Sequence, residues 1–340
     1  MECFWILFSF VYLATSFNVK QVKLGDPVTL LCKGQQKKDY PGRVEWSTSD
    51  QMVAQYSAGT FKPGRGFEDR VHLPDNGTLK KGNFSLTISP TVYSDYDTYE
   101  CWYENEHLNS WTLKIMTSLP ATYVMLGDAA TLPCYARINR NTPESDITLQ
   151  WTKGDEIVLS IKNGILRKFK NFQQRVTVTP SEIRKGNISL HFSETYLSDN
   201  GTYTCQMDNN VKHVTLQLTA CHRTIPVALG QALLIPLHTD ENVNVLFQRP
   251  QISQTYIVIC ETSCNTMDWS KRLYDMELKI VRKEHIGTYN IMHRSKHQTI
   301  CTYVIVSPEN IKNNNELTCN TNRVFIALIV CSCIYFCVRI

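Results

Sequence analysis

The feature that most constrains this chain is an eight-residue phrase that occurs three times. It reads SDYDTYEC at 94–101, SDNGTYTC at 198–205 and EHIGTYNI at 284–291. A second phrase precedes each copy, reading LGDPVTLLC at 24–32, LGDAATLPC at 126–134 and LGQALLIPL at 229–237. Such self-similarity is typical of a structural unit that is repeated along a chain. The 340 residues therefore divide into units of about 100 residues each.

The segments between these phrases alternate apolar and polar residues with a period of two. In NFSLTIS at 83–89, Phe84, Leu86 and Ile88 alternate with Ser85, Thr87 and Ser89. This alternation is typical of a half-buried strand. Turn-forming residues recur about every 8 to 12 residues, as in all-β domains, and no sustained helical period precedes the C-terminal apolar segment. We therefore predict an all-β chain.

In the first two units a cysteine is followed by a tryptophan and then by Tyr-x-Cys. This arrangement resembles the immunoglobulin fold, a sandwich of two β-sheets. The resemblance implies roles for several sets of residues: disulfides Cys32–Cys101 and Cys134–Cys205, core tryptophans Trp46 and Trp151, corner tyrosines Tyr99 and Tyr203, and ion pairs Arg70–Asp95 and Arg175–Asp199.

The cysteines of each implied pair are 69 and 71 residues apart. That distance accommodates nine strands and indicates variable-type domains. The phrases RV and KGN-x-S-L before the second cysteine are similar to those of butyrophilin-like and T-cell costimulatory-ligand ectodomains. This resemblance extends from Val19 to about Ala220. It implies a module that binds another surface protein.

The third unit has lost both cysteines of the pair. Counted from the shared glycine, the first position holds Leu237, and the last position of the eight-residue phrase holds Ile291. We place Phe247 at the tryptophan position. Because both cysteines are missing, no unpaired buried thiol remains, and Tyr289 of the corner is retained. We predict a degenerate immunoglobulin-like sandwich in which Leu237 contacts Ile291.

Nine of the 13 cysteines lie between the two terminal apolar segments. In a secreted or surface protein such cysteines are interpreted first as disulfides. Cys221 with Cys301 and Cys260 with Cys264 are possible pairs in the third unit. Cys319 is then left over, and it would permit a disulfide-linked dimer.

A zinc site is the alternative for part of this set. Its ligands would be Cys260 and Cys264 with His285, His293 and His297. The extracellular setting and a spacing that does not repeat favour disulfides. We predict no metal site.

The termini predict a membrane protein. Residues 4–14 are apolar and are followed by small residues, as in a signal peptide. Residues 324–338 are 15 apolar residues between Arg323 and Arg339, which indicates a short single-pass anchor; a GPI-attachment signal is the alternative. The predicted organisation is 1–16 signal peptide, 17–118 first domain, 119–219 second domain, 220–308 third domain, 309–323 stalk, 324–338 transmembrane segment and 339–340 cytoplasmic remnant.

Four sequons occur in the predicted ectodomain, at Asn76, Asn83, Asn187 and Asn200. Asn83 and Asn187 hold equivalent places in the first two units, and we expect glycans on both. Asn200 lies in the corner phrase itself, where attachment is less favoured.

The segment WYENEHLNSW at 102–111 joins the last two strands expected for the first domain. Aromatic side chains among adaptable polar ones are typical of protein interfaces, and no sequon falls in this segment. Trp102 and Trp111 could instead point inward. The candidate contact residues are Trp102, Tyr103, Glu104, Asn105, Glu106 and His107.

The formal net charge is only +4, and no long basic run indicates a nucleic-acid partner. No phosphate-binding loop and no pairing of a nucleophile with a base is evident, so we predict neither an enzyme nor a cofactor. We expect a plasma-membrane glycoprotein that binds another surface protein, itself immunoglobulin-like, through its membrane-distal domain, in immune recognition or adhesion. The alternatives are a viral or soluble decoy of such a receptor and a GPI-anchored adhesion protein.

Overall fold

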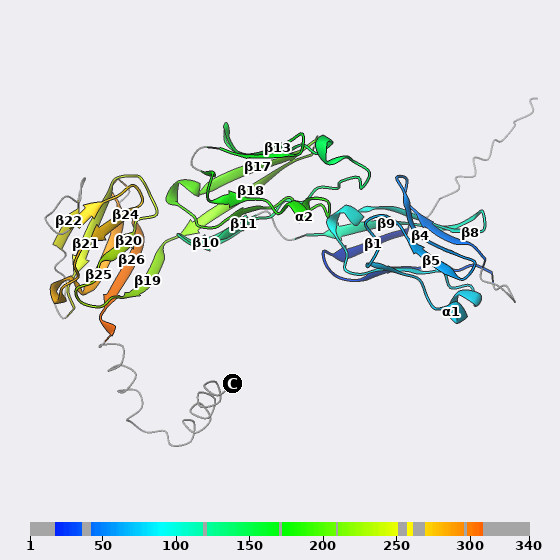
Figure 1. Ribbon diagram of the computed structural model, residues 1–340, viewed down its shortest axis with the longest axis horizontal. Coiled ribbons are helices and arrows are strands. Elements are labelled where there is room, and N and C mark those ends of the chain that lie inside the picture. The colour runs from blue at the N-terminus through cyan, green and yellow to red at the C-terminus, as the bar shows by residue number, and fades with distance from the viewer. Residues whose placement is uncertain are drawn as a thin grey trace, which may run out of the picture. The chain divides into compact units, whose positions relative to one another are not determined.

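The computed structural model describes residues 18–35, 42–117, 121–169, 172–208, 210–250, 257–260, 269–295 and 298–308, and in 257–260 only the backbone. The described chain forms three β-sandwiches, here called domains 1, 2 and 3 (Figure 1). The all-β prediction is confirmed. The predicted signal peptide, stalk and anchor lie outside the described residues, as do Cys264 and Cys319. Among the described residues, no helix has the length and apolar character needed to cross a bilayer.

Domain 1 packs a six-stranded front sheet on a three-stranded back sheet, and its first strand runs parallel to its last. The front sheet has the order β1 (Asn18–Lys23), β9 (Glu106–Met116), β8 (Asp97–Tyr103), β3 (Val44–Ser47), β4 (Met52–Ser57) and β5 (Thr60–Pro63). The back sheet has the order β2 (Val28–Leu30), β7 (Leu86–Ile88) and β6 (Val71–His72). The short helices are α1 (Asn76–Lys80) and η1 (Tyr93–Asp95).

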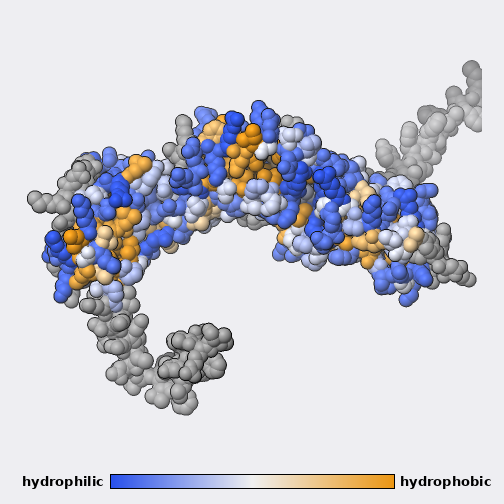
Figure 2. Space-filling view, in the orientation of Figure 1, coloured by the Kyte–Doolittle hydropathy of each residue, from blue (hydrophilic) through white to orange (hydrophobic). Residues whose placement is uncertain are grey.

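Domain 2 repeats this plan. Its front sheet has the order β10 (Ala121–Met125), β18 (Asn210–Thr219), β17 (Gly201–Met207), β12 (Leu149–Lys153), β13 (Glu156–Lys162) and β14 (Ile165–Lys168). Its back sheet has the order β11 (Ala130–Leu132), β16 (Leu190–Phe192) and β15 (Val176–Thr177). The short helices are η2 (Glu144–Asp146), α2 (Pro180–Ile183) and η4 (Leu197–Asp199). Exposed apolar residues of this domain include Ile165 and Leu166, and Figure 2 shows apolar surface on it.

Domain 3 has a five-stranded and a three-stranded sheet. The larger has the order β19 (Cys221–Pro226), β26 (Thr299–Val306), β25 (Gly287–His293), β21 (Val243–Gln248) and β22 (Ile257–Cys260). The smaller has the order β20 (Leu233–Pro236), β24 (Asp275–Leu278) and β23 (Trp269–Lys271), and η5 is Lys283–His285.

The chain clusters into two compact units. The first holds domain 1 and most of domain 2. The second holds domain 3 together with 123–129, 194–200 and the end of β18.

Disulfides cross the cores of domains 1 and 2. They join Cys32 to Cys101 and Cys134 to Cys205, the pairs that the resemblance implies. In domain 1, Trp46 pairs in register with Cys101, is fully buried, and donates from Nε1 to the Phe84 carbonyl at 2.7 Å. Trp151 pairs with Cys205 and donates to the Ile188 carbonyl at 3.0 Å. The tryptophan therefore ties the front sheet to the back sheet beside each disulfide.

The tyrosine corner turns the chain in domains 1 and 3. The Tyr99 hydroxyl donates to the Asp95 carbonyl at 2.8 Å, and Tyr289 donates to His285 at the same distance. Burial, reinforced by the Asp95 charge, holds the pKa of Tyr99 well above its ordinary value. The ion pair of Arg70 with Asp95 is confirmed at 2.7 Å.

The corresponding pair in domain 2, Arg175 with Asp199, stays a prediction. Tyr203 is fully buried, and its corner hydrogen bond also stays a prediction.

The core of domain 3 corrects one assignment. Leu237 and Ile291 are both fully buried in the same apolar cluster, and their direct contact stays a prediction. Phe247, however, is not at the tryptophan position: Val245 pairs with Ile291, and Phe247 lies two residues further on, opposite Tyr289. A shift of two keeps a side chain on the same face of a strand, so the burial pattern could not reveal it.

The tryptophan of this core comes from the other sheet. The ring centroid of Trp269, on β23, lies 5.6 Å from that of Tyr289. The ring centroid of Phe247, on β21, lies 4.7 Å from that of Tyr289. Trp269 is 6% exposed. The sequence comparison of the repeats missed this residue because it lies on a strand where domains 1 and 2 have no tryptophan.

Domain 3 also carries a disulfide at a different place. Cys221 on β19 and Cys301 on β26 are bonded, and their Cα atoms are 4.4 Å apart in parallel register. The bond joins two neighbouring strands of one sheet, the first and the last of domain 3 along the chain, and does not cross between the two sheets. Cys260 lies on β22, but its predicted pairing with Cys264 falls outside the described residues.

Candidate functional site

The outward face of the domain 1 front sheet carries a polar and aromatic network. Alternation on β3 and β8 buries Trp46 and Cys101 and turns Glu45 and Trp102 outward. Glu45 accepts from Arg43 at 2.5 Å and from Gln55 on β4 at 3.1 Å. Side chains from two neighbouring strands and the segment before them are thereby held together on one exposed face.

Trp102 is the aromatic centre of this face. Its Nε1 donates to Glu100 at 3.2 Å, and the His107 ring lies against it edge-on with centroids 5.0 Å apart. His107 in turn shares a hydrogen bond with Ser110 at 2.8 Å. Trp102 is partly buried and His107 is exposed, so the indole presents an ordered apolar surface beside polar groups.

The turn between β8 and β9 is held by backbone and side-chain bonds to the segment before β3. The Glu104 amide donates to the Arg43 carbonyl at 2.8 Å, and the Glu104 carboxylate accepts from the Arg43 amide at 3.1 Å. Gly42 has a φ of +69°, and a Cβ there would lie 2.5 Å from that carboxylate. Glycine is therefore required for this close approach. Asn105 and Glu106 complete the exposed turn.

Tyr103 is the one predicted contact residue that the structure contradicts. It is 5% exposed, and its ring stacks on Phe84 with centroids 4.8 Å apart. Because successive residues of a strand point to opposite faces, Trp102 and Tyr103 cannot both face outward. Trp111, considered as a possible inward residue, packs against the domain 1 core and donates to the Leu31 carbonyl. We name the outward-facing set Arg43, Glu45, Gln55, Glu100, Trp102 and His107 the front face.

The sequons at Asn83 and Asn187 have a structural role in the described chain. The side-chain Oδ1 of Asn83 accepts from the Ser85 hydroxyl at 2.7 Å, and that hydroxyl accepts from the Cys32 amide at 3.1 Å. Asn187 and Ser189 repeat these bonds beside Cys134. The Asn-x-Ser spacing thus satisfies a buried amide next to each disulfide, and glycosylation at either asparagine stays a prediction.

The other two sequon asparagines are exposed. Asn76 accepts from the Tyr56 hydroxyl at 2.6 Å. Asn200 accepts from the Leu218 amide at 2.9 Å. Glycosylation of both also stays a prediction.

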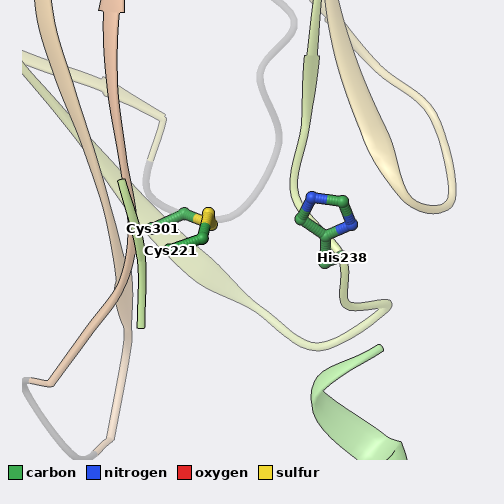
Figure 3. A group of neighbouring side chains, drawn as sticks. All are labelled: Cys221, His238 and Cys301. Carbon is green, nitrogen blue, oxygen red and sulfur yellow. A yellow bond between two sulfur atoms is a disulfide. The ribbon is translucent and has the colours of Figure 1, made fainter. Parts of the chain in front are cut away.

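Cys221, Cys301 and His238 form a buried group whose ligand atoms lie within 4.8 Å of one another. Figure 3 shows that the two sulfur atoms are bonded to each other. Zinc takes cysteine as thiolate, so this group offers no such ligand while the disulfide is intact. Burial and the nearby Arg223 lower the pKa of His238 to about 4, against the opposing charge of Asp128.

Of the residues of the alternative zinc site, the structure describes the side chains of His285 and His293 only. His285 accepts from the Arg282 amide at 3.0 Å, and His293 contacts Glu241 at 2.7 Å. Cys264 and His297 lie outside the described residues.

Two arginines that the sequence interpretation missed join domains 1 and 2 within the first compact unit. Arg137 contacts Asp50 at 2.6 Å and also Asp97. These two carboxylates raise the pKa of Arg137, although burial opposes them. Arg140 contacts the fully buried Asp95, which Arg70 of domain 1 already binds. The signal for this contact in the sequence is only the basic pair in RINR at 137–140.

Domains 1 and 2 therefore have the features of variable-type immunoglobulin domains: nine described strands, a disulfide between the sheets and a first strand on the front sheet. The family model described as "Immunoglobulin V-set domain" matches residues 18–113 and 118–220, more than half of the chain. The chain belongs to the immunoglobulin V-set family. Domains of this family are typically binding modules without enzymatic activity.

Two curated relatives are similar to the chain. Matrix remodeling-associated protein 8 of Gallus gallus is 24% identical over 47% of this chain and 44% of its own length. Programmed cell death 1 ligand 1 of Mus musculus is 27% identical over 30% of this chain and 37% of its own length. The chain thus spans less than half the length of these relatives. A solved titin tandem, I9–I11, covers 85% of this chain and 96% of its own at 14% identity, and its TM-score of 0.23 adds nothing to the family assignment.

Proposed function

We propose that this protein is a plasma-membrane recognition protein that binds another cell-surface protein through the front face of domain 1. The observation that supports the proposal is the ordered network around Trp102. Tryptophan and arginine are enriched among the residues that dominate binding energy at protein interfaces. On the front face both are held by carboxylates, Trp102 by Glu100 and Arg43 by Glu45.

The family context supports the same proposal. One curated relative is by its name a ligand of another protein, programmed cell death 1. V-set domains commonly bind partners through the sheet that carries their last two strands. The apolar segment at 324–338 would anchor the chain on the side of domain 3, which places domain 1 farthest from the membrane along the sequence.

The experiment is a screen of the full-length chain, displayed on cells, against a library of surface proteins, followed by variants at the front face. Trp102→Ser is expected to weaken binding of the identified partner at least tenfold, because central interface tryptophans contribute about 2 kcal/mol or more. Tyr123→Ser is the matched control, since Tyr123 is a 67% exposed aromatic residue of domain 2. Equal binding by the parent and Trp102→Ser, at equal surface expression, would show that the front face is not the contact.

A further inference from the structure

A pocket of 230 Å³ opens on the first compact unit, where loops of domains 1 and 2 meet. Domain 1 supplies Arg65 and Arg70, and domain 2 supplies Arg140, Arg184 and Lys185. None of the described residues that line it is acidic. A concave site walled by five cations attracts anions, because the walls focus one sign of potential.

Two of these cations are fixed before any ligand arrives. Arg70 and Arg140 both contact the fully buried carboxylate of Asp95, and both lie over the Phe67 ring, at 5.2 and 3.9 Å. Arg70 also donates to the Gly66 carbonyl at 2.7 Å. The charge of Glu68, which accepts from the Gly66 amide at 3.0 Å, also acts on both guanidiniums. The positive potential of the pocket therefore comes mainly from Arg65, Arg184 and Lys185 around these two fixed arginines. Each guanidinium carries five donors. Arg70 uses four of them, on Asp95 and on the Gly66 and Pro90 carbonyls, so the donors left for a ligand are chiefly those of Arg140.

The remaining cations are exposed or make only surface contacts. Lys185 contacts Glu182 at 2.6 Å, and Arg184 approaches Glu144 at 3.7 Å, where the Glu144 side chain is 81% exposed. Arg65 is exposed. Surface pairs of this kind contribute about 0–1 kcal/mol, so a ligand with more than one acceptor oxygen can compete for these side chains.

The size of the pocket indicates the ligand class. Sites for whole small molecules usually measure about 300–1,000 Å³, so this pocket fits a single group. Arginine forks match the paired oxygens of phosphate-like anions. We propose that this pocket binds one tetrahedral oxyanion group, carried as a sulfate ester on an extracellular polysaccharide or present as free sulfate or phosphate. Because both domains line the pocket, the bound anion would also hold domains 1 and 2 together.

The test measures binding of a heparin hexasaccharide, inorganic sulfate and inorganic phosphate to the purified full-length chain by calorimetry at fixed ionic strength. Arg65→Ser/Arg184→Ser removes two pocket cations without touching Asp95. Lys62→Ser/Arg167→Ser is the matched control, since it removes two exposed cations from the strands β5 and β14. We expect the first pair to weaken binding about tenfold or more and the control to change it less than twofold, because charge-assisted bonds are lost only in the first.

The hexasaccharide and the free ions distinguish the source of the group. If the hexasaccharide binds more tightly than inorganic sulfate and phosphate, the bound group belongs to a polysaccharide. If the affinities are equal, the ligand is a free ion. Either result supports the proposal that the pocket binds an oxyanion. Equal weakening by the two double variants, or no binding of any of the three anions by the parent chain, would overturn the proposal. If the double variant does not fold, Arg65→Ser alone is expected to weaken binding about threefold, and an unchanged affinity there is equally decisive against it.

Discussion

The fully buried carboxylate of Asp95 is predicted to be the most sensitive polar group of domain 1. It accepts from Arg70 at 2.7 and 3.0 Å, from the Val92 amide at 2.7 Å, and from Arg140 of domain 2. The substitution Asp95→Asn keeps the size of the side chain but removes its charge. One amide oxygen can still accept, while the new NH₂ group faces guanidinium donors.

The expected cost follows from these contacts. Arg70 and Arg140 are only 16% and 12% exposed, so neither can recover full hydration after the carboxylate is lost. Breaking a buried pair by removing one partner costs about 3–5 kcal/mol. Loss of two charge-assisted hydrogen bonds, at about 1.5–3 kcal/mol each, gives about 3–6 kcal/mol, which overlaps this range. We therefore expect Asp95→Asn to lower the free energy of unfolding of domain 1 by about 3–5 kcal/mol.

Hydrogen exchange detected by mass spectrometry measures the free energy of unfolding of each domain separately. A single unfolding curve of a multidomain chain does not separate the domains. Peptides that cover β8 and β3 should exchange at least about 100-fold faster in Asp95→Asn, because about 1.4 kcal/mol corresponds to a tenfold change. Asp97→Asn is the control: its partner Arg137 is 37% exposed, so a loss of about 1 kcal/mol or less is expected. Less than fivefold acceleration in Asp95→Asn, or equal acceleration in both variants, would refute the reasoning from burial.

Two further predictions concern domain 3. Replacing Cys221 and Cys301 together by alanine releases a loop with a sequence separation of 80 residues. Chain entropy then predicts that the free energy of unfolding of domain 3 falls by about 4.5 kcal/mol. Hydrogen exchange of β25 peptides measures this loss, and a loss below about 1 kcal/mol would contradict the prediction. For His238, the folded pKa of about 4 lies below the ordinary value of about 6.5, so the unfolded state binds more protons between these values. Stability therefore falls as pH drops from about 6.5 to 4, by up to about 3 kcal/mol. In His238→Asn, which tolerates the positive φ of 54° at this position, that pH dependence should disappear from the stability of domain 3 measured by hydrogen exchange, while its stability at pH 7.5 changes little.

The repeated phrases and cysteine spacings sufficed to predict the fold class. Period-two alternation and the Tyr-x-Cys corner are local properties, and a local pattern is written into consecutive residues. The roles of Trp46 and of Tyr99 came from the resemblance to the immunoglobulin fold. For the candidate site, the sequence indicated the segment from Trp102 to His107 but not the face to which each side chain points.

The tertiary structure decided whatever depends on register or on a second domain. The pairing register of two strands is not written in either strand alone, which is why Val245, not Phe247, stands opposite Ile291. The burial of Tyr103, in contrast, follows from its alternation with the buried Cys101 on the same strand. The contact of Arg140 with Asp95 joins residues 45 positions apart in different domains. No local pattern specifies such a contact, because its strength depends on the burial of the two side chains, and they become buried together only once the two domains are packed together.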